Sequence, residues 1–411
     1  MKRRELLQRS AAFGGLATLS SVGAPLLLTA CGGGGSEEPA AGNAYRQTNL
    51  AATSASYNAL FTYPDMVDAW GVAIRPAGAG GHFWVTASAG SYEFVGDVNG
   101  TPLEVDPALV QISLPASADN PGAANGVVFN STGTGFRITQ TLENGESFTA
   151  PAKFVFVSDN GVISAWAQRA NADGSLSYPQ YANTILDQGA DNSAFFGLAI
   201  SPTFDKLFAA DFGNNPYPRI RVFNDSFVEE PVAGRFANPF VAEGSFKPGD
   251  YAPWAIHTIT VNGTPSVFVA YVRTLEDPDN PGGVLLATEN TGRGTSKLVE
   301  YTPAGQLVAV WNDRGTLNGP WGVAMAPANF GPFSNHLIVA NFSDGTLVAF
   351  DPATKSAVEF LRDPTGAYTV ISGIWGILFG NGVKLGDTNA LYFAAGPADE
   401  TEGLFGSLRV A

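Results

Sequence analysis

The chain has 411 residues, with 22 Lys and Arg against 37 Asp and Glu, and a formal net charge of −15. This charge excludes nucleic acid and anionic membrane surfaces as charge-driven partners, because their phosphates would be repelled. A single cysteine excludes an intramolecular disulfide, so packing alone must hold the fold, and 48 Gly and 27 Pro indicate many turns.

The first thirty residues have the pattern of an export signal. Four basic residues lie within the first nine positions and precede a run of small and apolar residues that Gly and Pro interrupt. Such a run is too broken for a membrane span and predicts a signal peptide over residues 1–30. Arg3-Arg4 before Glu5-Leu6-Leu7 resembles the twin-arginine export signal, and an ordinary basic leader is the alternative.

The only cysteine, Cys31, follows Leu28-Thr29-Ala30 and precedes the stretch GGGGSEEPAAG. This arrangement resembles the bacterial lipobox, in which a peptidase cuts before the cysteine and the thiol carries a diacylglycerol. A free surface cysteine is the alternative, although exported proteins rarely leave a thiol unpaired. We therefore expect a lipidated Cys31, a flexible tether over residues 31–43, and attachment to the cell envelope, at the outer membrane or cell surface in a Gram-negative host.

A short motif recurs six times along the rest of the chain. Each copy has a small residue followed by alternating aliphatic residues, and in four copies a Trp comes directly before the small residue. The small residues fall at positions 71, 126, 197, 255, 322 and 376, and further apolar strands follow each copy after a turn. Period-2 alternation within the copies indicates strands rather than helices.

Six repeats of short strands predict an all-β fold, a six-bladed β-propeller formed by residues 44–411 as one domain. In blade two, the segment GFRITQ (135–140) is interpreted as a blade strand. The last repeat supplies only three strands before the chain stops, whereas the strand-like segment 45–50 is otherwise unassigned. We therefore expect residues 45–50 to pair with LFGSLRV (404–410) and to complete blade six.

The recurring motif has a structural explanation in such a fold. Inner strands converge on the axis, so a Gly or Ala allows close approach, while the aromatic residue on the other face packs against a neighbouring blade. A ring of tryptophans that binds sugars or bases is the alternative. The structural residues predicted in this way are Trp70, Gly71, Gly126, Phe196, Gly197, Trp254, Trp321, Gly322, Trp375 and Gly376.

The stretches LNGPWGVAMAP, VANFSDGTLVAFD, GIWGILFGNG and LYFAAGPADETEGLFG resemble NHL-type and SMP-30-like propeller repeats. Residues 45–408 are similar to a family of exported bacterial propellers, some of which carry PEP-CTERM sorting tails. This sequence lacks a sorting tail and has a lipobox instead. The resemblance implies the propeller fold and an extracytoplasmic location, and it implies no particular activity, because none is established for the family.

Serine-type hydrolase chemistry has little support. The chain has three histidines and no G-x-S-x-G motif. His82 and His336 both open second strands, so equivalent structural placement is the simpler explanation. His257 lies in the inner strand of blade four, where a polar side chain can face the channel, and it is the candidate catalytic base.

Polar residues of the loops on one face of the propeller are candidate metal ligands. Carboxylates and amides that converge on an axis suit Ca²⁺, which takes about six to eight oxygen ligands. In SMP-30-like lactonases, an axial metal polarises an ester carbonyl. The alternative is that these acidic loops are only solvated. The candidate ligands are Asp68, Asn125, Asn318 and Asp399.

Three function classes remain open. We favour an anchored, monomeric binding module whose protein or small-molecule ligand lies on the loop face and whose contact with membrane is through the lipid alone. A calcium-dependent lactonase-like hydrolase is the second, so the sequence leaves open whether the protein is an enzyme. A structural component of the envelope or matrix is the third.

Overall fold

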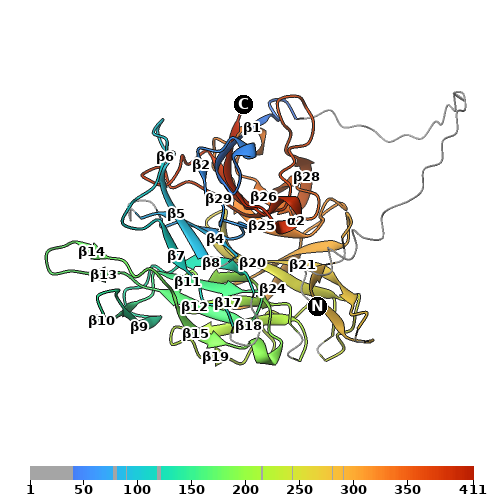
Figure 1. The fold of residues 1–411 in the computed structure, drawn as a ribbon. Coiled ribbons are helices and arrows are strands. Elements are labelled where there is room, and N and C mark those ends of the chain that lie inside the picture. The colour runs from blue at the N-terminus through green and yellow to red at the C-terminus, as the bar shows by residue number, and fades with distance from the viewer. Residues whose placement is uncertain are drawn as a thin grey trace, which may run out of the picture.

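The computed structural model of the chain describes residues 40–76, 81–88, 90–117, 122–213, 216–242, 244–279, 281–289 and 291–411. Regular structure in these residues is almost entirely β-strand, and the only α-helix described is α2 (Pro397–Glu400). Six sheets of four or five strands, antiparallel apart from one parallel pair, account for most of the described strands. The inner strand of each sheet contacts that of the next around a closed ring, which confirms the predicted six-bladed propeller (Figure 1). None of the described helices has the length and apolar character needed to cross a bilayer.

Each blade is numbered here from its strand nearest the axis. Blade one contains β3 (Val72–Ala73), β4 (Phe83–Ala87) and β5 (Gly90–Gly96), with β6 (Leu103–Glu104) and β7 (Gln111–Ser113) both paired to β5. Blade two contains β8 (Ala124–Phe129), β11 (Phe154–Ser158), β12 (Val162–Trp166) and β15 (Asn183–Asp187). Blade three contains β16 (Phe195–Ile200), β17 (Lys206–Asp211), β18 (Arg219–Asn224) and β19 (Glu229–Glu230).

The second half of the ring follows the same pattern. Blade four contains β20 (Tyr251–Val261), β21 (Thr264–Glu276), β23 (Ser296–Tyr301) and β24 (Leu307–Val310), with β22 (Val284–Glu289) paired to β21. Blade five contains β25 (Pro320–Met325), β26 (Leu337–Asn341), β27 (Leu347–Asp351) and β28 (Ser356–Phe360). Blade six contains β29 (Ile374–Phe379), β30 (Leu391–Ala395), β31 (Leu404–Val410) and β1 (Tyr45–Ala52), which β2 (Phe61–Thr62) extends.

The N-terminal strand completes blade six, as predicted. β1 pairs antiparallel with β31 from Tyr45 opposite Val410 to Ala52 opposite Leu404. Strands from the two ends of the described chain thus share one sheet. Pairing of this kind closes the ring and covers an edge of β31 that would otherwise be open.

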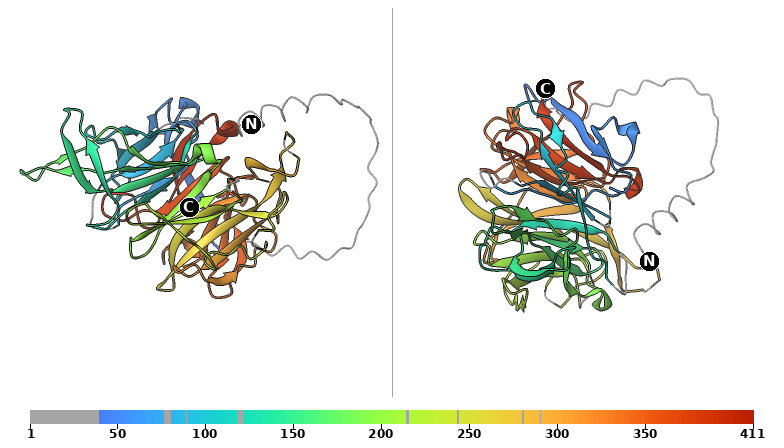
Figure 2. Two further views of the ribbon diagram at one scale, coloured as in Figure 1. Left: turned by 90° about the horizontal axis from the view of Figure 1, so that it is seen from below. Right: turned by 60° about the vertical axis from the view of Figure 1, so that its left-hand side comes forward.

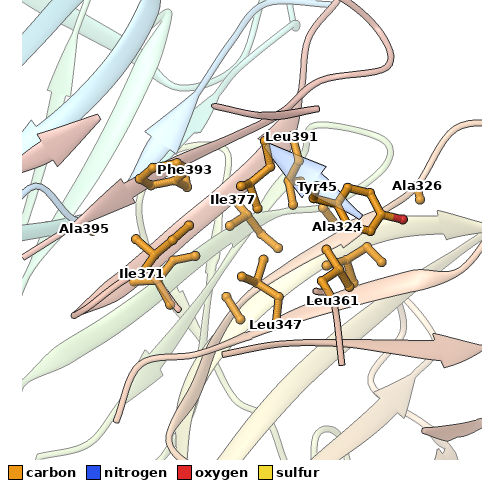
Figure 3. Packing of buried hydrophobic residues seen from close by; sticks show 14 of the residues in the cluster. Tyr45, Ala324, Ala326, Leu347, Leu361, Ile371, Ile377, Leu391, Phe393 and Ala395 are labelled. Atoms are coloured by element: carbon orange, nitrogen blue, oxygen red, sulfur yellow. The ribbon is translucent and has the colours of Figure 1, made fainter. Parts of the chain in front are cut away.

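Seven hydrophobic clusters of the described residues hold the propeller together. Six of them lie between successive blades, and one lies at the axis. Figure 3 shows the cluster between blades five and six, where Tyr45 and Leu391 meet Ala324 and Leu361. Both faces of a blade are therefore buried, which explains why central strands such as β4 and β26 are buried along their whole length.

One predicted strand lies outside its blade. The segment GFRITQ contributes to β9 (Arg137–Thr141), which pairs only with β10 (Ser147–Pro151), whereas β11 is the strand that pairs with β8. A second small hairpin, β13 (Arg169–Ala170) with β14 (Leu176–Ser177), also belongs to blade two. Both hairpins project from the body of the propeller (Figure 2). The interpretation of GFRITQ as a blade strand was wrong because hairpin strands alternate just as blade strands do.

Candidate functional site

Aromatic side chains fill the axis of the propeller. We call Trp70, Phe196, Trp254, Trp321 and Trp375 the axial cluster. Trp70 stacks on Trp375 with 3.9 Å between ring centroids, and Trp321 lies edge-on to both. Contacts of Trp70 with Phe196 at 5.5 Å and of Trp254 with Trp375 at 6.2 Å join blades that are not neighbours. Such contacts are possible only across the axis.

These aromatic residues do pack against neighbouring blades, since Trp70 stacks on Trp375 and Phe196 on Trp254. They also meet rings across the axis, which the sequence did not indicate. The inner strands of blades three to six each have a register shift where the aromatic residue stands, for example between Pro253 and Ala255 around Trp254. A bulge of this kind turns a side chain away from the regular alternation, here toward the axis. All five rings are at most 4% exposed, which leaves no stacking surface for a sugar or a base.

The glycines of the motif lie against the backbone of the next blade. A Cβ on Gly71 would lie 2.1 Å from the carbonyl oxygen of Asn125, and one on Gly322 would lie 2.4 Å from that of Trp375. Gly376 meets the carbonyl oxygen of Trp70 in the same way. Gly126 and Gly197 are equally confined by the inner strands of blades three and four. Close approach of backbones, rather than an unusual φ, requires glycine at these positions.

Side chains at two candidate positions bond the inner strands of neighbouring blades. Nδ2 of Asn125 donates to the carbonyl oxygen of Phe195 at 2.6 Å, and Nε2 of His257 donates to that of Trp321 at 2.7 Å. Burial lowers the pKa of His257 to about 4, although the bond to Trp321 opposes this shift. His257 is thus neutral at pH 7 with its Nε2 proton in use, and a catalytic role for it stays a prediction.

Two of the other three candidate metal ligands, Asp68 and Asn318, also have partners within the protein. Oδ1 of Asp68 accepts a 3.2 Å hydrogen bond from Nε1 of Trp375. Asn318 accepts from the backbone N–H of Gly292 and donates to Asp344, while Asp399 is exposed in α2. Within the described ranges, no three His, Cys, Asp or Glu side chains gather closely enough to hold a metal ion. Calcium binding at the axis remains a prediction that needs a direct test.

A cavity of about 130 Å³ opens between blades three and four. It lies on the loop face, which we define as the face carrying the connections from second to third strands and from one blade to the next. The connection 231–250 covers it, β18 forms one wall, and Tyr271 of β21 lies at its base. Most of its lining is apolar or aromatic: Tyr217, Pro218, Ile220, Val232, Phe236, Val241, Phe246, Pro253 and Tyr271.

Two arginines give the cavity a positive edge. The side chain of Arg219 is 23% exposed and approaches Glu229 only to 3.9 Å, because Glu229 bonds closely to Arg221 instead. Arg235 lies 3.7 Å from Glu230 and bonds to a backbone oxygen. At the base, the hydroxyl of Tyr271 pairs with that of Tyr301 at 2.8 Å. An apolar space with a partly available guanidinium suits a small group that carries a negative charge.

Sequence reasoning missed this cavity. Its residues come from the start of β18, the irregular connection 231–250 and two strands of blade four. No periodic pattern links these segments. The one sequence signal was the density of Pro and aromatic residues around 216–218 and 236–240, beside Arg219 and Arg235.

Comparison with known proteins adds fold-level relatives. No family model matches the chain. Two uncharacterised proteins of Acanthamoeba polyphaga mimivirus, R648 and L690, are 25% and 26% identical to it over 88% and 84% of the chain and 79% and 80% of their own lengths. Bacterial and exported status stays a prediction, and Cys31 lies outside the described residues.

Solved structures with a similar backbone fold include a glucose dehydrogenase. It is 15% identical with a TM-score of 0.44, and the match covers 88% of this chain and 98% of that one. A protein of unknown function from Bacteroides thetaiotaomicron is 9% identical with a TM-score of 0.45, covering 84% of this chain and 70% of that one. Virginiamycin B lyase from Staphylococcus aureus is 14% identical with a TM-score of 0.40, covering 89% and 99%.

Proposed function

We propose that this propeller is an exported, lipid-anchored binding module that holds its ligand in the cavity between blades three and four. The observation that carries the proposal is the combination of an apolar space with the partly available Arg219 at its edge. The axis offers no comparable space, because the axial cluster fills it with buried rings.

The size and charge of the cavity define the ligand class. A protein cavity of about 150 Å³ is large enough to bind benzene, so a space of similar volume admits one ring or a few aliphatic carbons. A negative charge next to the ring would meet Arg219 at the rim. The ligand is therefore a small amphipathic anion with one apolar group of ring size.

Anchoring rests on the sequence signals at Cys31. The backbone N–H of Ala40 donates to Oε2 of Glu359, and Asn43 bonds the carbonyl oxygen of Phe360. Residues 40–43 thus lie against β28, the outer strand of blade five.

Binding is tested by calorimetry with benzoate and its neutral analogue benzamide. We expect the wild-type protein to bind benzoate more tightly than benzamide, and Arg219→Gln to remove this preference while keeping weak binding of both. Val241→Trp, which fills the cavity, should abolish binding. Arg137→Gln, on the exposed β9, is the charge-matched control. Equal binding of benzoate by the wild-type protein and Val241→Trp would contradict the proposed site.

Anchoring is tested separately in the full-length protein. Cys31→Ser should release the protein from the membrane fraction and abolish labelling with a radioactive fatty acid. Continued membrane association of Cys31→Ser would contradict lipid anchoring without affecting the cavity.

A further inference from the structure

A second charged site lies at the seam between blades one and two, on the face opposite the loop face. Arg75 follows the inner strand β3, and its guanidinium lies over the rings of Phe129 at 5.6 Å and Phe154 at 6.0 Å. Nη2 of Arg75 donates to Oε1 of Gln168 at 2.6 Å, whereas its buried Nε has no hydrogen-bond partner among the described residues. The neighbouring aromatic rings hold the guanidinium in place.

Lys153 brings a second positive charge to the same place. It directly precedes Phe154, one of the two rings beneath Arg75, and it is only half-exposed. In the part of the chain that the structure describes, its ammonium group has no hydrogen bond and no ion pair. The carbonyl oxygen of Lys153 accepts from the backbone N–H of Asn130, so Lys153 adjoins both of the rings beneath Arg75. Burial lowers the pKa of Lys153, and the charge of Arg75 lowers it further.

The described groups around Arg75 and Lys153 do not neutralise their two positive charges. Asp106 is the carboxylate next to Tyr178, and its oxygens accept from Nε2 of His82 at 3.1 Å and from the backbone N–H of Ala108 at 2.9 Å. His82 adds no negative charge, and the pKa of its ring is lowered by burial. The ring of Tyr178 packs against Trp166 in the same seam. Burial raises the pKa of Tyr178, whereas the charge of Arg75 opposes this rise.

Two adjacent, partly buried cations are costly without a counter-charge, because each loses hydration and repels the other. The chain has 15 more acidic than basic residues, yet none of the described carboxylates pairs with Arg75 or Lys153. A guanidinium, an ammonium and a phenol hydroxyl together present the hydrogen-bond donors that an oxyanion needs.

We infer that Arg75, Lys153 and Tyr178 form a binding site for a doubly charged oxyanion of the phosphate or sulfate type. The anion sits between the two cations, relieves their repulsion and ties blade two to blade one. This site is independent of the cavity on the loop face, since it involves different blades and the opposite face of the ring.

The test compares Lys153→Met with Lys247→Met, an exposed lysine of the connection 231–250, which changes the net charge equally. Thermal unfolding and calorimetry are run at low ionic strength with inorganic phosphate, sulfate or chloride at matched ionic strength. Phosphate and sulfate should raise the midpoint of the wild-type protein more than chloride does. Lys153→Met should bind phosphate at least about tenfold more weakly, a loss of about 1.4 kcal/mol, whereas Lys247→Met should bind it normally.

Removing the repulsion between Arg75 and Lys153 gives a second readout. In chloride alone, Lys153→Met should unfold at a higher temperature than the wild-type protein, because one of two uncompensated charges is gone. Identical effects of phosphate and chloride on the wild-type protein would overturn the inference. A lower midpoint of Lys153→Met in chloride would also overturn it, because it would show that a group of the chain itself already pairs with the lysine.

Discussion

The hydroxyl of Tyr45 donates a 2.9 Å hydrogen bond to the carbonyl oxygen of Phe330, and the two rings lie 4.7 Å apart. Tyr45 begins the strand that completes blade six, whereas Phe330 lies between the first two strands of blade five. The N-terminal strand is therefore attached twice, through its pairing with β31 and through this contact with the next blade. Closure of the ring depends on side-chain packing as well as on backbone hydrogen bonds.

Tyr45 is consequently predicted to be a main contributor to ring stability. Tyr45→Phe removes only the hydrogen bond and should lower the free energy of unfolding by about 1 kcal/mol. Tyr45→Ala also removes a buried ring and should cost about 3–5 kcal/mol. Urea unfolding measures both, with the exposed Tyr368→Phe as a control. Deletion of 44–52 should lower the midpoint further, and an unchanged midpoint in the deletion would show that the ends are not joined.

The inner glycines provide a second prediction, about backbone contact. Gly322→Ala places a methyl group 2.4 Å from the carbonyl oxygen of Trp375, so the inner strands of blades five and six must separate. Overpacking of this kind costs about 1–3 kcal/mol or more. Gly133→Ala is the control, because a Cβ there meets nothing within 4 Å. Equal thermal midpoints for the two variants would contradict the close approach of the inner strands.

The calcium hypothesis can be separated from a structural role of Asp68. Asp68→Asn keeps an oxygen that can accept from Nε1 of Trp375 but removes the charge that a cation needs. If Asp68 binds calcium, millimolar Ca²⁺ should raise the midpoint of the chelator-treated wild-type protein, and Asp68→Asn should lose this increase. Asp68→Ala should be destabilised by about 1–3 kcal/mol in either case, because the buried indole N–H loses its acceptor. If Ca²⁺ leaves the midpoint of the wild-type protein unchanged, the calcium hypothesis is contradicted.

Closure of the ring by the N-terminal strand was predictable from the sequence because it depends on counting the strands of each repeat. The last repeat lacks a strand, and residues 45–50 are strand-like and otherwise unassigned. The direction in which the tryptophan side chains point, toward the axis, was not predictable in the same way. A bulge is a property of two paired strands, so the shift around Trp254 becomes visible only when β20 is set against β21.

The two charged sites escaped prediction for a related reason. Arg75 and Lys153 are 78 positions apart, and the β9–β10 hairpin between them breaks the spacing of blade two. The cavity depends on the irregular connection 231–250. Periodicity predicts the blades but says nothing about where irregular segments fold back on them.

His257 should make stability depend on acid pH. Its pKa is about 4 in the folded protein, lower than the ordinary 6.5, so the unfolded chain takes up the proton first. The stability contribution of His257 is thus complete above about pH 6.5 and is lost as the pH falls toward 4, by up to about 1.4 kcal/mol per pH unit. In denaturant titrations from pH 4 to 8, the wild-type protein should lose stability relative to His257→Gln as the pH falls below about 6.5. His336→Gln is the matched control, and a wild-type slope in His257→Gln would contradict the assignment.

Glu93 should give stability the opposite dependence on pH. It is fully buried in β5, directly across from Trp84, and neither of its carboxyl oxygens has a hydrogen-bond partner in the described ranges. Burial raises the pKa of Glu93 well above its usual range, so the folded protein holds this proton more tightly than the unfolded chain. Its contribution to stability is therefore complete below about pH 4.5 and is lost progressively as the pH rises.

The expected consequence is a partial cancellation in the wild-type protein, because Glu93 and His257 impose opposite slopes between about pH 4.5 and 6.5. Glu93→Gln keeps the size and polarity of the side chain but cannot ionise. Its free energy of unfolding should therefore rise relative to the wild-type protein as the pH increases, by up to about 1.4 kcal/mol per pH unit, and the two proteins should differ least near pH 4. The exposed Glu104→Gln should follow the wild-type profile. Parallel profiles of Glu93→Gln and the wild-type protein from pH 4 to 8 would contradict this prediction. They would mean that the carboxyl of Glu93 ionises equally easily in the folded and unfolded chains, which a fully buried position without a counter-charge does not allow.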